Sequence, residues 1–599
     1  MSQLTYLKAA LLALPVLVCQ GFSGNLEAPA RRQVLQPVHE YFNLNEVIAA
    51  KRRGELILNG FLNYTHLGSD FGFLGPGDAP CTKCPAVCVC VKTPDRWGGV
   101  WHSLNRLARE NVPLDLRAVY PPQITAAFQP KIVGVQVVAS GTGAMKLEFK
   151  TDISGSDVNP NAATWSRSFQ LKGNQQPETL SADVSADEIR TAQYLNWVAE
   201  PGSAIKVDSL SLRVELPEVD FPTYVFLSSY AKFARCHSEQ TGMVRDRAHT
   251  PAKTFANVPA TGMFALATVA AKQLGIVTED TARDILTRSS KAIFELPKMR
   301  GLLPHFVEQV DGRWAPIQAS EYSTIDTALC LMSLRLAANA LQDQATANQA
   351  LALMKGIDMS RLRDADGYVL HGLANDGRPL PSIWRDWGGE TALVLMMQRI
   401  AAGTSMDPKM DASGRSYRGV GFITELPALF FPQFNTNARA HAGAVDWLAY
   451  RQKRLAEQKA YFPKNAPGSV AAEMGLYGLS AGEGTNGIGY LASGVEDPDQ
   501  RTIYPHYILM SSLVSANPSE VYGLLGKMEA RGWLTPWGLV ENIGADGKAY
   551  LPMIGSLNAS FEALSAYHLL MQHRGQDNPL YQVASADPVF QDAIKAVFQ

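Results

Sequence analysis

The feature that most constrains the fold is a long run of helical patterns. From residue 221 to residue 599, segments with apolar residues three and four positions apart alternate with loops rich in Gly, Pro and Asp. Many of these segments are apolar on more than one face, as expected for helices packed on both sides. Helices are predicted at residues 224–236, 255–274, 279–296, 322–341, 391–401, 438–459, 507–514, 519–531 and 559–572. Such a series of paired helices with long loops predicts an (α/α)6 barrel over 221–599, whose inner helices point their N-terminal loops into a central cleft.

A shorter region with the pattern of strands precedes the helices, at residues 131–218. Its segments KIVGVQVVA, MKLEFKTDI and SLSLRVELP alternate apolar and polar residues, and polar turns such as DVNPNAA separate them. This pattern predicts a small β-sandwich, the architecture of many carbohydrate-binding modules. A structural or docking sandwich fits the pattern equally well, because no exposed aromatic platform for a sugar is evident there. The chain is therefore predicted to be multidomain, with a β-sandwich ahead of the all-α barrel.

The N-terminus has the pattern of a signal peptide. Residues 1–23 place one lysine ahead of an apolar run, and the run is too short to span a membrane. Cys19 offers an alternative, lipid attachment, but Val18 is a poor residue ahead of a lipidated cysteine. Cleavage after Ser23 predicts a periplasmic or secreted protein without a later transmembrane segment. Its segment 24–130 is expected to be partly helical and rich in cysteine.

Four of the cysteines lie close together in CTKCPAVCVC, at Cys81, Cys84, Cys88 and Cys90. This spacing could ligate zinc, but clustered cysteines in an exported protein usually form disulfides, which we favour. Cys330 lies inside an apolar helical pattern and is predicted to be a small buried side chain.

Composition narrows the class of ligand. Hydrophobic residues make up 46% of the chain and charged residues 18%, and the formal net charge is −2. These values are globular and give no electrostatic reason to expect a nucleic acid or an anionic membrane as partner. The eleven histidines include no HxxxH or HxH pair, and the chain has no nucleotide-binding loop and no GxSxG elbow. We therefore predict a neutral ligand, no cofactor and no catalytic metal.

Five acids enter helices or loops beside Trp and Gly. They occur in TGMVRDRA, EYSTIDTALCL, WRDWGGETALVLMM, GLYGLSAGEG and WLTPWGLVENIG, at Asp246, Asp326, Glu390, Glu483 and Glu541. Aromatic faces together with acidic and amide groups bind sugars, and a pair of carboxylates cleaves glycosidic bonds. The set as a whole indicates a carbohydrate-active site.

Each acid also has a structural interpretation. Asp246 could form an ion pair with Arg245 or Arg247. Asp326 and Glu390 could interact with the first-turn N–H groups and the dipole of their helices, which contributes about 0.3–1 kcal/mol. Glu541 could be an exposed loop acid. Only the combination favours a functional site.

In order along the chain, the motifs resemble a known family. GMVRDR resembles G-[LF]-V-x-D-R, STIDTALCLMSL resembles a helix with S-x-x-D-T-A, and WGGETALVLMM resembles a Y-[ND]-E segment before an apolar run. ALFFPQF resembles L-F-x-H-Q-Y, GLYGLSAGEG resembles W-G-[LI]-[ST]-A-S-D-G, and WGLVENI resembles Y-G-F-x-D-A-F. IYPHYILMSSLVSANPSEV resembles A-P-x-A-x-x-S-x-x-F-x-P-E-E. These motifs are those of the bacterial glycoamylase-like (α/α)6 domains, which include the endo-β-1,2-glucanases of glycoside hydrolase family 144 and domains of cyclic β-1,2-glucan synthases.

The resemblance implies an (α/α)6 barrel that cleaves a β-linked glucan with carboxylates in its central cleft. By motif, Asp326 matches the D-T-A aspartate and Glu390 the Y-N-E glutamate. Glu483 and Glu541 stand where the family has aspartate, so each carboxylate is one methylene longer. Pro432 replaces a frequent histidine, which marks the chain as a divergent member.

Our mechanistic hypothesis is hydrolysis with inversion, which uses an acid and a base about 6.5–9.5 Å apart. Glu390 is predicted to be the acid, because apolar and aromatic neighbours would raise its pKa. Glu541 or Asp326 is then the base. Substrate-binding residues are predicted at Asp246, Arg247, Trp384, Trp387, Gln433, Glu483 and Trp537.

Two other functions fit the same sequence. The barrel could be a non-catalytic glycan-binding or assembly protein that docks to a partner protein through its N-terminal region. It could also be a transglycosylase, as related domains of glucan synthases are. In all three cases the ligand is an oligo- or polysaccharide.

Overall fold

The computed structural model describes most of the chain from Tyr120 onward. Within 120–598 it leaves out 152–162, 174–175, 193, 249–254, 319, 387–388, 407–408, 412–416, 437–438, 441–444, 485–489, 516, 549 and 552–553. Ahead of Tyr120 it describes only 32–37, 58–59, 62–63, 71–74, 87–90 and 98–103. The predicted signal peptide, Cys81 and Cys84 lie outside these residues. So do the side chains of Cys88 and Cys90.

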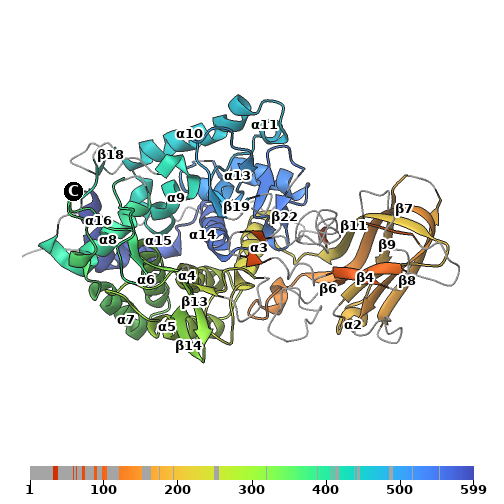
Figure 1. Cartoon of the computed structure of the whole chain (residues 1–599), viewed down its shortest axis with the longest axis horizontal. Coiled ribbons are helices and arrows are strands. Elements are labelled where there is room, and N and C mark those ends of the chain that lie inside the picture. Colours follow the sequence, from red (N-terminus) through yellow and green to blue (C-terminus); the bar gives the residue numbers. More distant parts are fainter. Residues whose placement is uncertain are drawn as a thin grey trace, which may run out of the picture.

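The strand region forms one antiparallel sheet, at the right of Figure 1. Its centre is the long strand β7, Lys131–Lys150. The first half of β7 pairs with β9 (Glu178–Asp183) and β11 (Ala204–Glu215), and the second half pairs with β8 (Ala163–Lys172) and β10 (Tyr194–Ala199). The predicted β-structure is confirmed, but a sandwich of two sheets is not, because all these strands are joined through β7.

Four strands from the predicted helical and Cys-rich segment belong to the same sheet. They are β1 (Gln33–Pro37), β4 (Phe71–Leu74), β5 (Val87–Cys90) and β6 (Gly98–Ser103). β1 and β5 pair with β11, β6 pairs with β10, and β4 pairs with β6. Outside the sheet, β2 (Leu58–Asn59) and β3 (Leu62–Asn63) form a hairpin. Helix α2 (Ala186–Ile189) follows β9 and begins with a capping box formed by Ser185 and Glu188.

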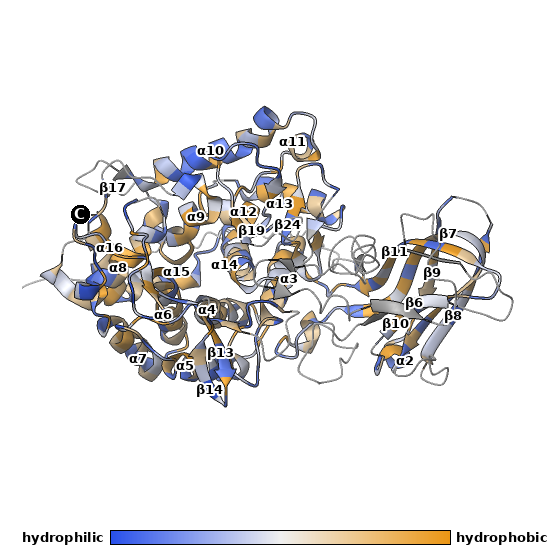
Figure 2. Ribbon diagram, in the orientation of Figure 1, coloured by the Kyte–Doolittle hydropathy of each residue, from blue (hydrophilic) through white to orange (hydrophobic). Residues whose placement is uncertain are grey.

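Six helices form a closed inner ring in the helical part. Each contacts the next along the chain, and the last contacts the first. In order, they are α4 (Val258–Gln273), α6 (Thr324–Ala340), α8 (Glu390–Ala402), α9 (Gly421–Phe430), α12 (His506–Met510) and α14 (Ser556–His573). The helices of this ring are buried on nearly every face, and α4, α6 and α14 are mostly hydrophobic in Figure 2. This ring is the inner layer of the predicted (α/α)6 barrel.

Further helices pack outside the ring. They are α3 (Phe221–Ala234), α5 (Glu279–Phe294), α7 (Gln344–Lys355), α10 (Trp447–Asn465), α11 (Val470–Met474), α13 (Pro518–Glu529), α15 (Pro579–Ala586) and α16 (Pro588–Phe598). Figure 2 shows that α10 is mostly hydrophilic, as expected for an outer helix. Several helices begin where a side chain caps the first turn, as Asp220 caps α3 and Ser323 caps α6. Cys330, in α6, is buried and free, as predicted.

Buried ion pairs join the layers. Lys232 of α3 contacts Glu562 of α14 at 2.7 Å, Arg335 of α6 contacts Asp587 ahead of α16 at 2.6 Å, and Arg451 of α10 contacts Glu425 of α9. Tyr120 also contacts the helical part, because its hydroxyl donates to the Pro536 carbonyl at 2.6 Å. Among the described residues, no helix has both the length and the apolar composition needed to cross a bilayer.

Candidate active site

The candidate site lies where the N-terminal ends of the inner helices meet. Asn257 caps α4, Asp326 is the third residue of α6, Glu390 is the first of α8, and Asn558 is the third of α14. A Cβ on Gly389 would come within 2.3 Å of the Ile423 carbonyl oxygen. The start of α9 therefore lies beside the start of α8. Gly389 therefore permits this close approach of two backbones.

Arg247 holds one group of acids together. It forms a short contact with Glu483 through Nη2, and its Nη1 lies 3.5 Å from Asp246 Oδ2. Asp246 Oδ1 also accepts a hydrogen bond of 3.1 Å from Asn257 Nδ2. All four side chains are buried. The predicted residues Asp246, Arg247 and Glu483 are thus brought together, and the partner of Asp246 is Arg247.

Glu541 adjoins this group with one oxygen fixed and one free. Its Oε1 accepts a hydrogen bond of 2.6 Å from Asn558 Nδ2 and another of 3.3 Å from the Glu483 backbone N–H. Its Oε2 is buried and has no hydrogen-bond partner in the described part of the chain. Burial raises the pKa of Glu541 to about 7, against the opposing effect of the Lys232 and Arg247 charges. Glu541 is not the exposed loop acid of the structural interpretation.

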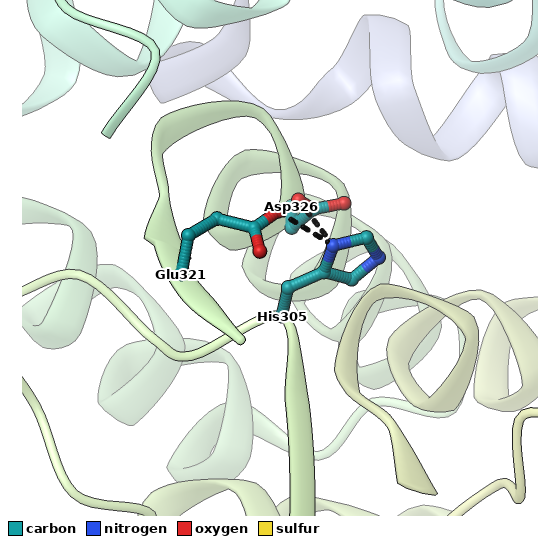
Figure 3. A group of neighbouring side chains, drawn as sticks. All are labelled: His305, Glu321 and Asp326. Carbon is teal, nitrogen blue, oxygen red and sulfur yellow. Dashed lines mark hydrogen bonds and ion pairs between the residues drawn. The ribbon is translucent and has the colours of Figure 1, made fainter. Parts of the chain in front are cut away.

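A second group consists of His305, Glu321 and Asp326, drawn in Figure 3. His305 Nδ1 lies 2.8 Å from Glu321 Oε1 and 3.5 Å from Asp326 Oδ2. Burial alone would lower the pKa of His305, but the carboxylates of Asp326 and Glu321 raise it to about 9. Burial raises the pKa of Asp326, and the charge of His305 opposes that rise. At neutral pH the group is an imidazolium between two carboxyl groups.

Among the described residues, these three side chains form the group that is close enough together to hold a metal ion. One ligand atom from each lies within 4.8 Å of the others. A carboxylate–carboxylate–imidazole set suits Zn²⁺ or Mn²⁺. A protonated His305 already donates Nδ1–H to Glu321 and carries a positive charge 3.5 Å from Asp326, so both acids have a counter-charge without a metal ion.

Glu390 has a different environment. It forms no hydrogen bond or ion pair with the described residues, and its side chain is partly exposed to solvent. Burial raises the pKa of Glu390 to about 8, and the charges of Asp326 and Asp386 add to this rise. A helix start normally favours the charged carboxylate, so the surroundings outweigh the helix dipole here. Glu390 is therefore a protonated acid at neutral pH, next to Asp326.

Asp386, four residues ahead of Glu390, was not predicted as a site residue. Its Oδ1 accepts a hydrogen bond of 2.7 Å from Thr391, and burial raises its pKa to about 6. Three carboxyl groups, those of Asp326, Asp386 and Glu390, thus interact at one side of the site.

The two predicted substrate-binding tryptophans that the structure describes are not exposed. Trp384 is 5% exposed, stacks on His371 at 3.8 Å between ring centroids and donates from Nε1 to Thr324 Oγ1 at 2.9 Å. Trp537 is 6% exposed and lies beneath the Arg235 guanidinium. Both rings support the loops that carry acids, and neither presents an exposed face in this structure.

Of the two remaining predicted residues, one lies outside the described residues and the other does not join the group. Trp387 lies outside the described residues. Gln433 follows the C-terminal end of α9, about 15 Å along the helix from the end that meets Glu390. Its Nε2 donates to Gln591 of α16 at 3.3 Å, so Gln433 contacts the C-terminal helix and not the group of acids.

Sequence reasoning missed His305, Glu321, Asn558 and Gly482. Gly482 makes room for the acids, since a Cβ there would lie 2.8 Å from both Glu541 Oε1 and Asn558 Nδ2. Glu321 and Gly482 stand inside the quoted motifs EYSTIDTALCL and GLYGLSAGEG, where the nearby acid drew attention first. His305 gave no local signal, because its partners lie 16 and 21 residues further on.

Known structures share this fold. The chain is similar to a β-1,2-glucanase from Parabacteroides distasonis, with a TM-score of 0.53 and 11% identity over 88% of this chain and 97% of that one. It is also similar to an endo-β-1,2-glucanase from Chitinophaga pinensis, solved with sophorotriose and glucose, with a TM-score of 0.51 and 12% identity over 63% of this chain and 99% of that one. No protein-family model and no curated protein matches the sequence. The similarity confirms the predicted fold, that of the glycoamylase-like (α/α)6 domains.

Proposed function

We propose that the chain is an exported glycoside hydrolase that cleaves a β-linked glucan, with β-1,2-glucan as the first candidate. The observation that carries the proposal is Glu390, an acid at the start of inner helix α8 that has no hydrogen-bond partner among the described residues and whose pKa is raised by burial and by the nearby Asp326 and Asp386. The fold similarity to β-1,2-glucanases supports the substrate class. The signal-peptide pattern of residues 1–23 supports export.

Glu390 is the general acid in this proposal. With a pKa of about 8 it carries its proton at neutral pH and can donate it to the glycosidic oxygen as the C1–O bond breaks. The leaving sugar departs as an alcohol, and Glu390 becomes a carboxylate. The charges of Asp326 and Asp386 keep the proton on Glu390 until that step.

Glu541 is the general base. Asn558 and the Glu483 backbone hold Oε1, which leaves the buried Oε2 to accept a proton from water. The resulting hydroxide oxygen bonds to C1 from the face opposite the leaving group, which inverts the anomeric centre. A pKa of about 7 suits a base that works near neutral pH. Asp326 is less suited, because His305 already binds one of its oxygens.

The first experiment incubates the mature protein with β-1,2, β-1,3, β-1,4 and β-1,6 glucans and measures reducing ends and product sizes. Turnover of one of them with the α-anomer formed first supports the proposal. Glu390→Gln should keep the fold and reduce turnover by about 10²–10⁴-fold. Unchanged hydrolysis by this variant contradicts the role of Glu390. Tight binding without new reducing ends identifies a binding protein, and rearranged or cyclic products identify a transglycosylase.

A second pair of variants separates the two candidate bases. Glu541→Gln should abolish turnover, whereas Asp326→Asn should keep part of it and move the alkaline limb of the pH profile to lower pH. The shift follows because Asp326 raises the pKa of Glu390. The reverse outcome, an inactive Asp326→Asn and an active Glu541→Gln, assigns the base to Asp326.

A further inference from the structure

The aromatic side chain that reaches solvent beside the acids is Tyr490, not one of the described tryptophans. It begins strand β20 (Tyr490–Ala492), which pairs with β19 (Ala481–Glu483). Its side chain is 39% exposed. Among the described residues, it forms no ring stacking and no hydrogen bond. Part of its surface is therefore accessible to a ligand.

The strand register places this ring next to the acids. Tyr490 pairs directly with Glu483 across the antiparallel hairpin. Side chains of directly opposed residues project from the same face, with Cβ atoms about 4.5–5.5 Å apart. Tyr490 therefore stands on the same side as the Glu483 carboxylate, which binds Arg247 and whose backbone N–H donates to Glu541.

Both proposed catalytic acids affect the pKa of the Tyr490 hydroxyl. Burial raises the pKa of Tyr490 well above its ordinary range, and the charges of Glu541 and Glu390 raise it further. Glu390 and Glu541 come from opposite sides of the ring of helices, yet both lie within electrostatic reach of this phenol. Tyr490 thus lies on the hairpin that adjoins Glu541 and within electrostatic reach of both proposed catalytic acids, where a sugar at the point of cleavage has to bind.

We propose that Tyr490 is a substrate-contacting residue whose ring forms the platform for a pyranose unit at the cleavage point of a neutral glucan chain. A pyranose presents C–H groups on its faces and hydroxyl groups around its edge. An exposed phenol ring packs against such a face and loses little conformational freedom in doing so. The edge hydroxyls of the sugar then face the carboxyl groups. The inference rests on the proposed function, because it assigns a role within the same site.

The neighbouring residue supplies a matched control. Leu491 is 40% exposed, similar to Tyr490, but successive residues of a strand point to opposite faces. Leu491 pairs with Gly482 and therefore projects from the face of the hairpin opposite to Tyr490 and Glu483. Leu491→Ala removes a similar exposed apolar side chain from the same hairpin without touching the proposed platform.

The test compares wild type, Tyr490→Ala, Tyr490→Phe and Leu491→Ala on the glucan that wild type hydrolyses, with kcat and KM measured separately. Loss of the ring should raise KM by about tenfold or more, because stacking and apolar burial together exceed about 1.4 kcal/mol. Tyr490→Phe should stay within about threefold of wild type, because it keeps the ring. Leu491→Ala should match wild type.

Three results overturn the inference while the proposed function stands. They are an unchanged KM for Tyr490→Ala, an equal loss in Leu491→Ala, and a loss in Tyr490→Phe as large as in Tyr490→Ala. The last of these would assign the role to the hydroxyl group. Circular dichroism on each variant verifies folding. A wild-type protein that neither hydrolyses nor binds any glucan of the panel would overturn the proposed function itself.

Discussion

Replacing Glu390 by Gln should make the protein more stable while it removes turnover. The ordinary pKa of 4.5 is raised to about 8 in the folded protein, so the folded state keeps a proton that the unfolded chain loses. Stability therefore falls as pH rises from about 4.5 towards 8, since the unfolded state binds fewer protons over that range. A glutamine cannot ionise, so the Glu390→Gln variant does not lose stability in this way as pH rises.

The size of the effect follows from the two pKa values. At pH 5 the unfolded chain gains only about 1 kcal/mol by ionising Glu390, whereas at pH 8 it gains up to about 4 to 5 kcal/mol. The stabilisation by Glu390→Gln should therefore be larger at pH 8 than at pH 5, by up to about 3.5 kcal/mol. Solvent access to the partly exposed side chain reduces this value.

The assay is urea unfolding of wild type and Glu390→Gln at pH 5 and pH 8. Helical circular dichroism follows the barrel. Glu520→Gln, a change at an exposed surface ion pair on α13, is the control and should behave alike at both pH values. An equal effect of Glu390→Gln at both pH values, or destabilisation at pH 8, would refute the argument that Glu390 is held protonated by its surroundings.

Three other predictions concern the acids and their supports. The kcat/KM profile should be bell-shaped around pH 7.5 and fall about 20-fold by pH 5.5 and by pH 9.5, because the active form needs Glu541 ionised, which requires a pH above about 7, and Glu390 protonated, which requires a pH below about 8; a flat profile contradicts this pair. Gly482→Ala should lower kcat by about 100-fold by displacing Glu541 and Asn558, whereas Gly523→Ala, where nothing lies within 4 Å, should leave kcat unchanged. Lys232→Met should lower the free energy of unfolding, measured in urea, by about 3–5 kcal/mol, because it leaves Glu562 buried without a counter-charge. Adding Glu562→Gln should recover part of this loss. Additive effects of the two changes would contradict the pairing.

The helices that were predictable are those with long apolar patterns. The predicted segments 279–296 and 322–341 match α5 and α6 closely. Helix α9 was missed, although the ring cannot close without it. It begins at Gly421 and contains Pro427, two residues that mark loops in most sequences. Burial on all sides supplies the stability that local propensity does not.

The positions of the acids at the starts of inner helices were predictable, and the exposure of the aromatic rings was not. An acid at the start of an inner helix has its position fixed by the chain itself, as at Asp326 and Glu390. The exposure of an aromatic ring depends on residues distant in sequence. Trp384 is covered by its contacts with His371 and Thr324, which no periodicity reveals. His305 was missed for the same reason, because Glu321, whose carboxylate contacts it, lies 16 residues further along the chain.

The departure of Glu541 from the aspartate of the resembling family fits an adapted site better than a disabled one. The longer side chain lets Oε1 reach Asn558 at 2.6 Å, and Gly482 leaves the space it passes through. Glu541→Asp would shorten the arm by one methylene and break that hydrogen bond. We therefore expect this variant to lose at least about tenfold in kcat with little change in KM, since a small displacement of a base is costly. Rates measured beside Glu541→Gln test this, and a gain in activity would mean that the glutamate weakened an ancestral site.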